Sequence, residues 1–271
     1  MRCLNFTQRW RLSKFIEMLT KVDEQAPAPM GFGLRAADRR SANALAIAGA
    51  VTPSGLAKAK AGIKTVDAVL LNSTDKDEKT LDKAAAKLDD EIWGVRGGTV
   101  SAEQARHLAE TGCDFIVFDA EGSSAALLDI EDIGKVVTIG DELDDDMARS
   151  IAGIPIDAVL YTPGELDLPL TVGGLLTLSR VRGLLDLPYI MAVSGAVTGD
   201  DIAALRNVGI AGLVMDLSAS DDIASTAKAI KNLPRKKPRH NRSSALVPHV
   251  AADGPQEYDD DDDYPDEDED I

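Results

Sequence analysis

The sequence predicts an α/β protein in which eight strand–helix units close into a barrel. Short apolar runs recur along the chain with a nearly constant spacing of 21–24 residues and one step of 33, and helical segments separate them. The composition agrees, because hydrophobic residues make up 44% of the chain and aromatic residues only 4%. Ala, Val, Ile and Leu must therefore fill the interior, as they do in parallel strands buried on both faces. Eight such units favour a (β/α)8 barrel of the TIM type, and an open doubly wound sheet is the alternative.

Each apolar run marks an expected strand. The runs begin at residues 44, 67, 91, 113, 135, 156, 189 and 211. The first strand has an alternative in 31–36 (GFGLRA), but 44–51 preserves the spacing, and we expect the strand there. The long step after 156 predicts an added loop before a longer sixth helix.

The segments between the runs have the termini expected of helices. SAEQARHLAETG and TGDDIAALRNVG, for example, begin with hydroxyl or acidic residues and end in Gly. Side-chain oxygens at a helix start accept the free backbone N–H groups, acidic residues there suit the helix dipole, and Gly suits the helix end.

The chain ends differ from the barrel, predicted over 44–234. Residues 1–25 contain an amphipathic helix whose apolar residues follow helical spacing, and 26–43 form a Pro- and Gly-containing lead-in. Residues 235–271 are basic and then acidic, with too few apolar residues to fold, so we expect a disordered tail.

The apolar stripe of the N-terminal helix requires a cover. We expect it to pack against the amino-terminal end of the barrel. A protein partner or second copy is the next alternative, followed by an anionic membrane surface that could attract the basic residues Arg2, Arg9, Arg11 and Lys14. The charged tail is a second candidate site for a protein partner.

Charge and cysteine content restrict the function classes. The formal net charge is −17, but segment 257–270 holds 11 acidic residues and no basic ones, which leaves −6 for the rest. A mildly acidic body argues against nucleic-acid binding. Cys3 and Cys113 are too few for a disulfide framework, and we see neither a membrane-spanning run nor a secretory signal, so we expect a cytoplasmic protein.

Carboxylates dominate the positions where barrel enzymes place their chemistry, at the carboxyl ends of the strands. In VFDAEG, Asp119 and Glu121 are two residues apart, so on an extended strand they would share one face. We expect them to bind Mg²⁺ or Mn²⁺, with Glu165 or Asp216 completing the ligand set and Glu165 as a catalytic carboxylate, or else to act in acid–base catalysis. The alternative is a solvated loop in which one of them caps the next helix. No organic cofactor is evident.

Arg96 is the only cation that ends any of the expected strands two to eight. Gly97 and Gly98 follow it and would let an anion approach the backbone closely. We expect Arg96 to clamp a substrate carboxylate and to act in catalysis, with Asn72 as a further substrate-binding residue; a salt bridge to neighbouring acids is the alternative for Arg96.

The stretch 189–220 resembles the last quarter of phosphate-binding (β/α)8 barrels such as thiamine-phosphate synthase and indole-glycerol-phosphate synthase. The resemblance implies the barrel fold and turns after strands seven and eight that touch the substrate, here at Ser194, Gly195 and Ser218. One glycine of the first turn is replaced, the second turn has lost its glycine, and Asp216 stands where a phosphate would sit. Two like charges 4 Å apart repel by about 4 kcal/mol at an effective dielectric of 20, so we expect the phosphate site to be lost.

Two functions follow. The first is a metal-assisted enzyme of lyase or aldolase type acting on a small carboxylate or carbonyl substrate at the barrel mouth. The second is a catalytically inactive barrel retained as a scaffold or interaction module. The eroded phosphate turns, and the lack of Lys or His at any expected strand end, support the second function.

Overall fold

The computed structural model describes residues 13–23, 44–73, 78–164 and 168–233. The predicted lead-in 26–43 lies outside these described residues, as do the predicted tail 235–271 and the start of the predicted N-terminal helix.

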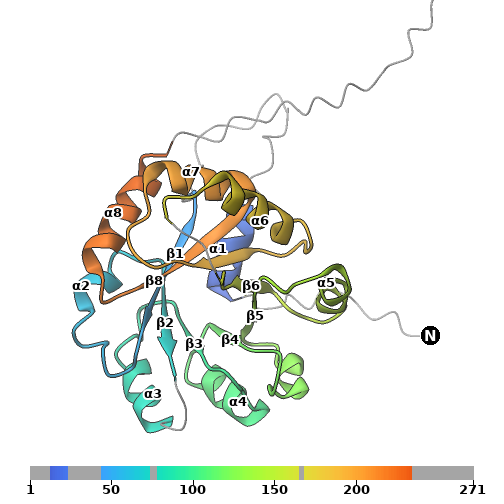
Figure 1. Ribbon diagram of the computed structural model, residues 1–271. Coiled ribbons are helices and arrows are strands. Elements are labelled where there is room, and N and C mark those ends of the chain that lie inside the picture. Colours follow the sequence, from blue (N-terminus) through green and yellow to red (C-terminus); the bar gives the residue numbers. More distant parts are fainter. Residues whose placement is uncertain (1–12, 24–43, 74–77, 165–167, 234–271) are drawn as a thin grey trace, which may run out of the picture. The chain divides into compact units, whose positions relative to one another are not determined.

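Eight parallel strands form a closed barrel in sequential order, each hydrogen-bonded to the next and β8 to β1 (Figure 1). The strands are β1 Ala46–Val51, β2 Ala68–Asn72, β3 Trp93–Arg96, β4 Phe115–Phe118, β5 Gly134–Ile139, β6 Ala158–Tyr161, β7 Tyr189–Ala192 and β8 Ile210–Asp216. This confirms the predicted (β/α)8 fold, and it confirms the first strand within 44–51.

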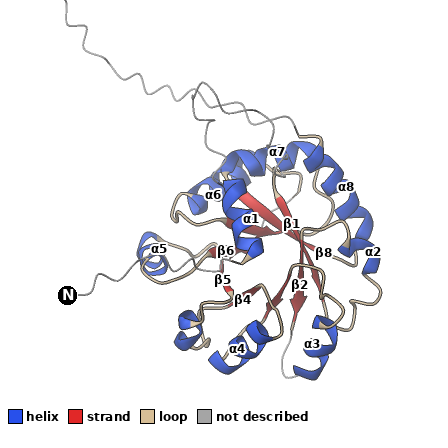
Figure 2. Ribbon diagram, turned by 180° about the vertical axis from the view of Figure 1, so that it is seen from behind, coloured by secondary structure: helices blue, strands red, loops and turns tan. Residues whose placement is uncertain are grey.

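Helices surround the strands, except α1, which lies across one end of the barrel (Figure 2). They are α1 Lys14–Asp23, α2 Lys60–Ile63, α3 Glu78–Ala85, α4 Ala102–Glu110, α5 Asp145–Ala152, α6 Val172–Arg182, α7 Gly199–Val208 and α8 Ser220–Lys231. The fourth unit has only a 3-10 turn, Ala125–Asp129. No helix within the described residues is long and apolar enough to cross a membrane.

Side chains along each strand point alternately outward and inward, and this alternation separates two buried regions. Residues such as Val69, Trp93 and Ile116 face outward and pack under the helices, in one large apolar cluster. Their neighbours Leu70 and Val117 face inward and fill the barrel with a second, smaller cluster. This two-residue period fixes which side chains reach the barrel axis, because successive strand residues point to opposite faces.

Helix α1 closes the amino-terminal end of the barrel. Its buried residues Phe15, Ile16, Leu19 and Val22 belong to the inner cluster, and the Phe15 ring stacks on that of Phe115 with centroids 4.5 Å apart. At the start of β5, a Cβ on Gly134 would lie 2.8 Å from Ile16 Cγ1, so only glycine lets the helix approach this closely. The predicted packing of the apolar stripe on the barrel is therefore observed, and the barrel interior covers it.

Polar contacts fix both ends of α1. The Asp114 carboxylate, just before β4, accepts hydrogen bonds from the backbone N–H groups of Lys14 and Phe15, both at 2.9 Å. At the other end, Arg182 of α6 binds Asp23 in a largely buried ion pair at 2.9 Å, and its guanidinium lies 5.1 Å from the centre of the Tyr189 ring.

Candidate functional site at the carboxyl end of the barrel

The inward face becomes polar where the strands end. Arg96 is paired in register with Asn72 on one side and with Val117 on the other. Both neighbours continue inward-facing rows, since Leu70 and Val117 are inner-cluster residues. Arg96 is half-buried, and none of the described residues forms a hydrogen bond or ion pair with its guanidinium. The predicted substrate residues Arg96 and Asn72 therefore lie side by side at the mouth.

Two threonines extend this polar face, and the sequence prediction missed both. Thr138 lies two residues after the inner-cluster residue Val136, and Thr162 lies two residues after Leu160. Thr162 continues the ladder, because its N–H donates to the Ile139 carbonyl. The alternation of β5 and β6 was the signal that could have located them.

Three side-chain oxygens at the mouth are buried without a hydrogen-bond partner among the described residues: Asn72 Oδ1, Thr138 Oγ1 and Thr162 Oγ1. Buried polar atoms in proteins are almost always hydrogen-bonded, so orphan atoms of this kind call for an explanation.

The opposite wall of the mouth is built from small or apolar residues. β1, β7 and β8 contribute Ala50, Ala192 and Val214, which pack with the inner cluster. In register, Ala192 pairs with Val214, and Ala50 with Asp216 at the outermost level. Polar groups therefore come from β2, β3, β5 and β6, and short or apolar side chains of β1, β7 and β8 face them, with the exposed Asp216 at the end of β8.

The predicted metal ligands do not share a strand face. β4 ends at Phe118, so Asp119 follows the inward row of Val117 whereas Glu121 lies in an exposed turn ending at Gly122, whose φ is +83°. Asp119 is held by its backbone, which donates to the Gly98 carbonyl at 3.0 Å. Within the described residues, no three His, Cys, Asp or Glu side chains group closely enough to hold a metal ion. Glu165 lies outside the described residues.

Two other polar residues near strand ends, Asp141 and Tyr161, serve the structure. The Tyr161 hydroxyl donates to Asp141 Oδ1, and the Gly164 N–H donates to Asp141 Oδ2 at 2.9 Å, which ties the loop after β5 to the loop after β6. These contacts, together with Arg180, lower the pKa of Asp141. Tyr161 belongs to the outer cluster, so its row points away from the mouth.

The turn after β7 contains the predicted residues Ser194 and Gly195, both exposed. Gly195 has a φ of +84°, a conformation that favours glycine. The helix that follows supplies its own anion: Asp201 accepts from the Thr198 N–H at 3.3 Å and from the Leu170 N–H at 2.8 Å. A carboxylate of the chain thus occupies the start of α7.

The turn after β8 is also filled by a carboxylate. Asp216 Oδ1 accepts a hydrogen bond from the Ser218 N–H at 2.8 Å, and the Ala219 N–H donates to the Asp216 carbonyl at 3.0 Å. The first turn of α8 adds Asp221 and Asp222. A phosphate group here would meet engaged N–H groups and negative charge, which agrees with the predicted loss of the phosphate site.

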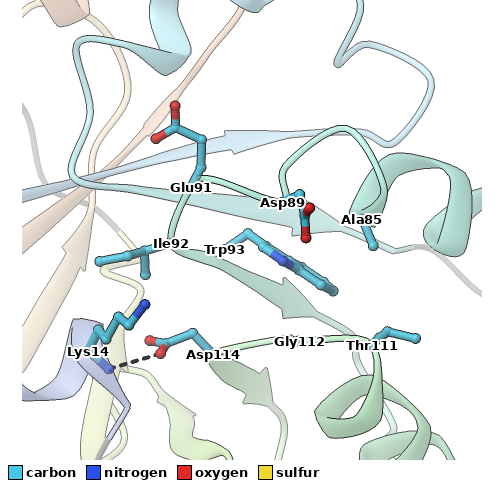
Figure 3. Close-up of a pocket in the computed structure, with 9 residues that line it drawn as sticks. All are labelled: Lys14, Ala85, Asp89, Glu91, Ile92, Trp93, Thr111, Gly112 and Asp114. Atoms are coloured by element: carbon cyan, nitrogen blue, oxygen red, sulfur yellow. Dashed lines mark hydrogen bonds between the residues drawn. The ribbon is translucent and has the colours of Figure 1, made fainter.

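Two surface cavities lie at the amino-terminal end of the barrel. One has a volume of about 130 Å³ and is lined by Lys14, Asp89, Glu91, Trp93 and Asp114, among others. Figure 3 shows the hydrogen bond that the Lys14 backbone N–H donates to the Asp114 carboxylate in this cavity. The other, of about 150 Å³, lies beside the start of β2 and the end of α8. Asp114 is already committed to capping α1, so we assign the first cavity to the structural end of the barrel.

No family model and no curated protein sequence matches the chain. Solved structures resemble the chain in fold, at low sequence identity. Tryptophan synthase from M. tuberculosis is 11% identical with a TM-score of 0.54, covering 70% of this chain and 94% of its own. A mutant tryptophan synthase alpha-subunit from Pyrococcus furiosus is 13% identical with a TM-score of 0.51, covering 69% and 96%. A designed cube-shaped protein cage is 17% identical with a TM-score of 0.52, covering 69% and 72%. These likenesses show the barrel fold.

Proposed function

We propose that the mouth of this barrel binds a small carboxylate or carbonyl compound and cleaves it in a reaction of lyase or aldolase type. The observation that carries the proposal is Arg96, an inward-facing, half-buried cation with no hydrogen-bond or ion-pair partner among the described residues. A partly desolvated guanidinium is costly unless an anion completes it, and its planar fork matches a carboxylate with two parallel hydrogen bonds.

The chemistry of a retro-aldol cleavage fits the residues at the mouth. A carboxylate base takes the proton of the substrate hydroxyl, a C=O bond forms at the hydroxyl carbon, and the adjacent C–C bond breaks, so that its electron pair forms the enolate of the second fragment. The protonated base then returns its proton to the enolate, which yields two carbonyl products. Arg96 would stabilise the charge of the carboxylate and the enolate, and Asp119, at the next step of the neighbouring inward row, would act as the base.

Assistance by Mg²⁺ or Mn²⁺ remains a prediction with Asp119, Glu121 and Glu165 as its ligands. A divalent cation bound there would polarise the substrate carbonyl. Asp119→Asn combined with Glu121→Gln should abolish any stabilisation of the full-length protein by millimolar Mg²⁺ or Mn²⁺. Absence of metal-dependent stabilisation in the unaltered protein would remove the metal from the proposal.

The test of the proposed function is calorimetric titration of the full-length protein with pyruvate and with lactate. We expect Arg96→Gln to weaken binding at least tenfold, because the substitution removes the cation and half of the guanidinium fork. The matched control is Arg149→Gln, which removes an exposed arginine that pairs with Asp146 on the surface of α5. Equal affinities for the unaltered protein and Arg96→Gln would contradict the proposal.

A second candidate function is that of a protein-interaction module, and one observation favours it. Within the described part of the chain, four large apolar side chains are exposed, on α5, on α6 and just after α5: Met147, Ile154, Val172 and Leu176. Val172 and Leu176 are one helical turn apart on α6 and are 75% and 68% exposed. If this function is right, Val172→Ser with Leu176→Ser should abolish self-association or partner binding without changing pyruvate affinity.

A further inference from the structure

The unpartnered oxygens at the mouth all lie on the inward face of the barrel sheet. Asn72 ends β2, Thr138 lies in β5, and Thr162 follows β6, and each continues an inward row whose lower members are apolar. The inner cluster below them contains only apolar residues, from Phe115 up to Leu160. The polar atoms therefore form the layer that lies directly above the closed core.

These oxygens differ from other buried polar groups of the described residues, several of which are paired. The Tyr189 hydroxyl donates to the Val181 carbonyl at 2.7 Å, and the Asp157 carboxylate accepts from the Lys135 N–H at 2.8 Å. A buried polar group without a partner lowers stability. Three of them, on the same inward face of the sheet as a cation that also lacks a partner among the described residues, indicate groups reserved for a ligand.

The residue types define what they would bind. A threonine hydroxyl both donates and accepts, and the asparagine carbonyl oxygen accepts, so the layer suits hydroxyl and oxo groups. Arg96, in register with Asn72, supplies the site for a carboxylate. Asp201 already holds the Thr198 N–H at the start of α7, and Asp216 holds the Ser218 N–H after β8, so a phosphate would meet a carboxylate at both places.

We infer that Thr138 and Thr162 are substrate-binding residues that select a small unphosphorylated hydroxy- or oxo-carboxylate, held at its carboxylate by Arg96. The inference rests on the proposed function and names its substrate class. The threonines act through hydrogen bonds to the hydroxyl or oxo group, with Asn72 as the third member of the layer, and the small residues Ala50 and Ala192 stand on the opposite wall.

The experiment compares three-carbon acids that differ in one group. Calorimetric titrations of the full-length protein use lactate, pyruvate and propionate, which lacks the oxygen on the second carbon. We expect the unaltered protein to bind lactate or pyruvate at least tenfold more tightly than propionate, because sites built around hydrogen bonds reject ligands that leave those bonds unmade. Thr138→Val with Thr162→Val should reduce this preference to less than threefold, and the corresponding serine variants should restore it.

Thr226→Val is the matched control. The Thr226 hydroxyl is equally buried and unpartnered among the described residues, but it lies on α8 against the outer cluster. This variant should keep the tenfold preference. The valine variants at the mouth should not lower the melting temperature of the unliganded protein, since they remove unsatisfied oxygens; should the double variant fail to fold, each single variant is titrated alone and should reduce the preference at least twofold.

Each result has a separate meaning. If all variants keep the preference for lactate or pyruvate while Arg96→Gln loses binding, the inference is overturned and the proposed function stands. If the unaltered protein binds none of the acids, both are overturned. A further titration compares glycerate with 3-phosphoglycerate, and tighter binding of the phosphorylated acid would overturn the assignment to unphosphorylated substrates.

Discussion

The two ends of this barrel treat their polar groups in opposite ways. At the amino-terminal end, the Asp114 carboxylate holds two backbone N–H groups of α1, and Arg182 holds Asp23. At the carboxyl end, Arg96 has no partner among the described residues, and the oxygens of Asn72, Thr138 and Thr162 are buried without one. The polar groups at the first end are paired with one another, whereas those at the second end have no partner among the described residues.

This difference predicts where the protein gives up stability for function, namely at the carboxyl end of the barrel. Barrel proteins keep stability at the amino-terminal face and chemistry at the carboxyl face. Groups that await a ligand destabilise the free protein, so substitutions at the two ends should affect stability with different magnitudes and even different signs.

The largest loss of stability is expected from weakening the packing of α1, the plug that closes the amino-terminal end of the barrel. Phe15→Ala deletes a fully buried ring that stacks on Phe115, and it should lower the free energy of unfolding by about 3–5 kcal/mol, as large-to-small core substitutions do. Urea unfolding of the full-length protein measures this. The control is Lys21→Ala on the exposed face of the same helix, which should change stability by less than about 0.5 kcal/mol. A loss below about 1 kcal/mol for Phe15→Ala would mean that α1 does not pack in the barrel.

A smaller loss is expected at the cap of the plug. Asp114→Ala removes the acceptor of the Lys14 and Phe15 N–H groups, and loss of such a cap costs about 1–2 kcal/mol. Asp89→Ala is the control, because Asp89 lines the same cavity but is exposed. Equal unfolding free energies for the two variants would show that Asp114 does not anchor α1.

At the mouth the expected change in stability is near zero or positive. Arg96→Met keeps much of the side-chain length but removes a partly buried cation without a described partner, so the free energy of unfolding should stay within about 0.5 kcal/mol or rise. Chemical denaturation measures it in parallel with pyruvate binding, which should be lost. A loss above about 1 kcal/mol would show that Arg96 has a structural partner.

The smallest effects concern pH and have opposite signs at the two ends. Contacts with Tyr161, Gly164 and Arg180 lower the pKa of Asp141, so the stability it contributes is present above its unfolded pKa of about 4 and is lost as the pH falls through the native pKa. Burial raises the pKa of Asp157, so its contribution is greatest below about pH 4 and declines as the pH rises through the native pKa.

Urea unfolding between pH 3 and pH 7 separates the two carboxylates. Relative to the unaltered protein, Asp141→Asn should be less stable at pH 7 and recover in acid, whereas Asp157→Asn should gain stability as the pH rises. Changes of the same sign in both variants would contradict the assigned environments.

The fold could be predicted from the sequence because regular spacing is a strong signal. The apolar runs at 67 and 113 each contain a strand of the barrel, the run at 211 begins one residue after the start of β8, and the spacing also placed the first strand correctly. The prediction of the metal ligands depended on the length of β4, which is shorter than expected. The pair Asp119 and Glu121 was expected to share a face, but the chain leaves the extended conformation after Phe118, and nothing in VFDAEG marks that end.

The site was predicted only in part. Arg96 and Asn72 were expected at the mouth because charged and amide side chains after apolar runs are conspicuous. Thr138 and Thr162 were missed because threonine inside a strand is ordinary, and their significance depends on inward direction and on missing partners. Tyr161, the last residue of β6, faces outward although it stands directly before Thr162. Strand direction therefore decides between neighbouring residues that composition does not distinguish.

The plug also has a consequence for biosynthesis. Helix α1 is translated before any strand of the barrel, yet it packs on β8, the last strand, as well as on β1. Its apolar stripe thus leaves the ribosome long before its docking surface exists, and a nascent chain halted before β8 would carry that stripe uncovered. Such exposed stripes promote aggregation and chaperone binding. The newly made chain is therefore protected from both only once β8 has formed and α1 has docked on it.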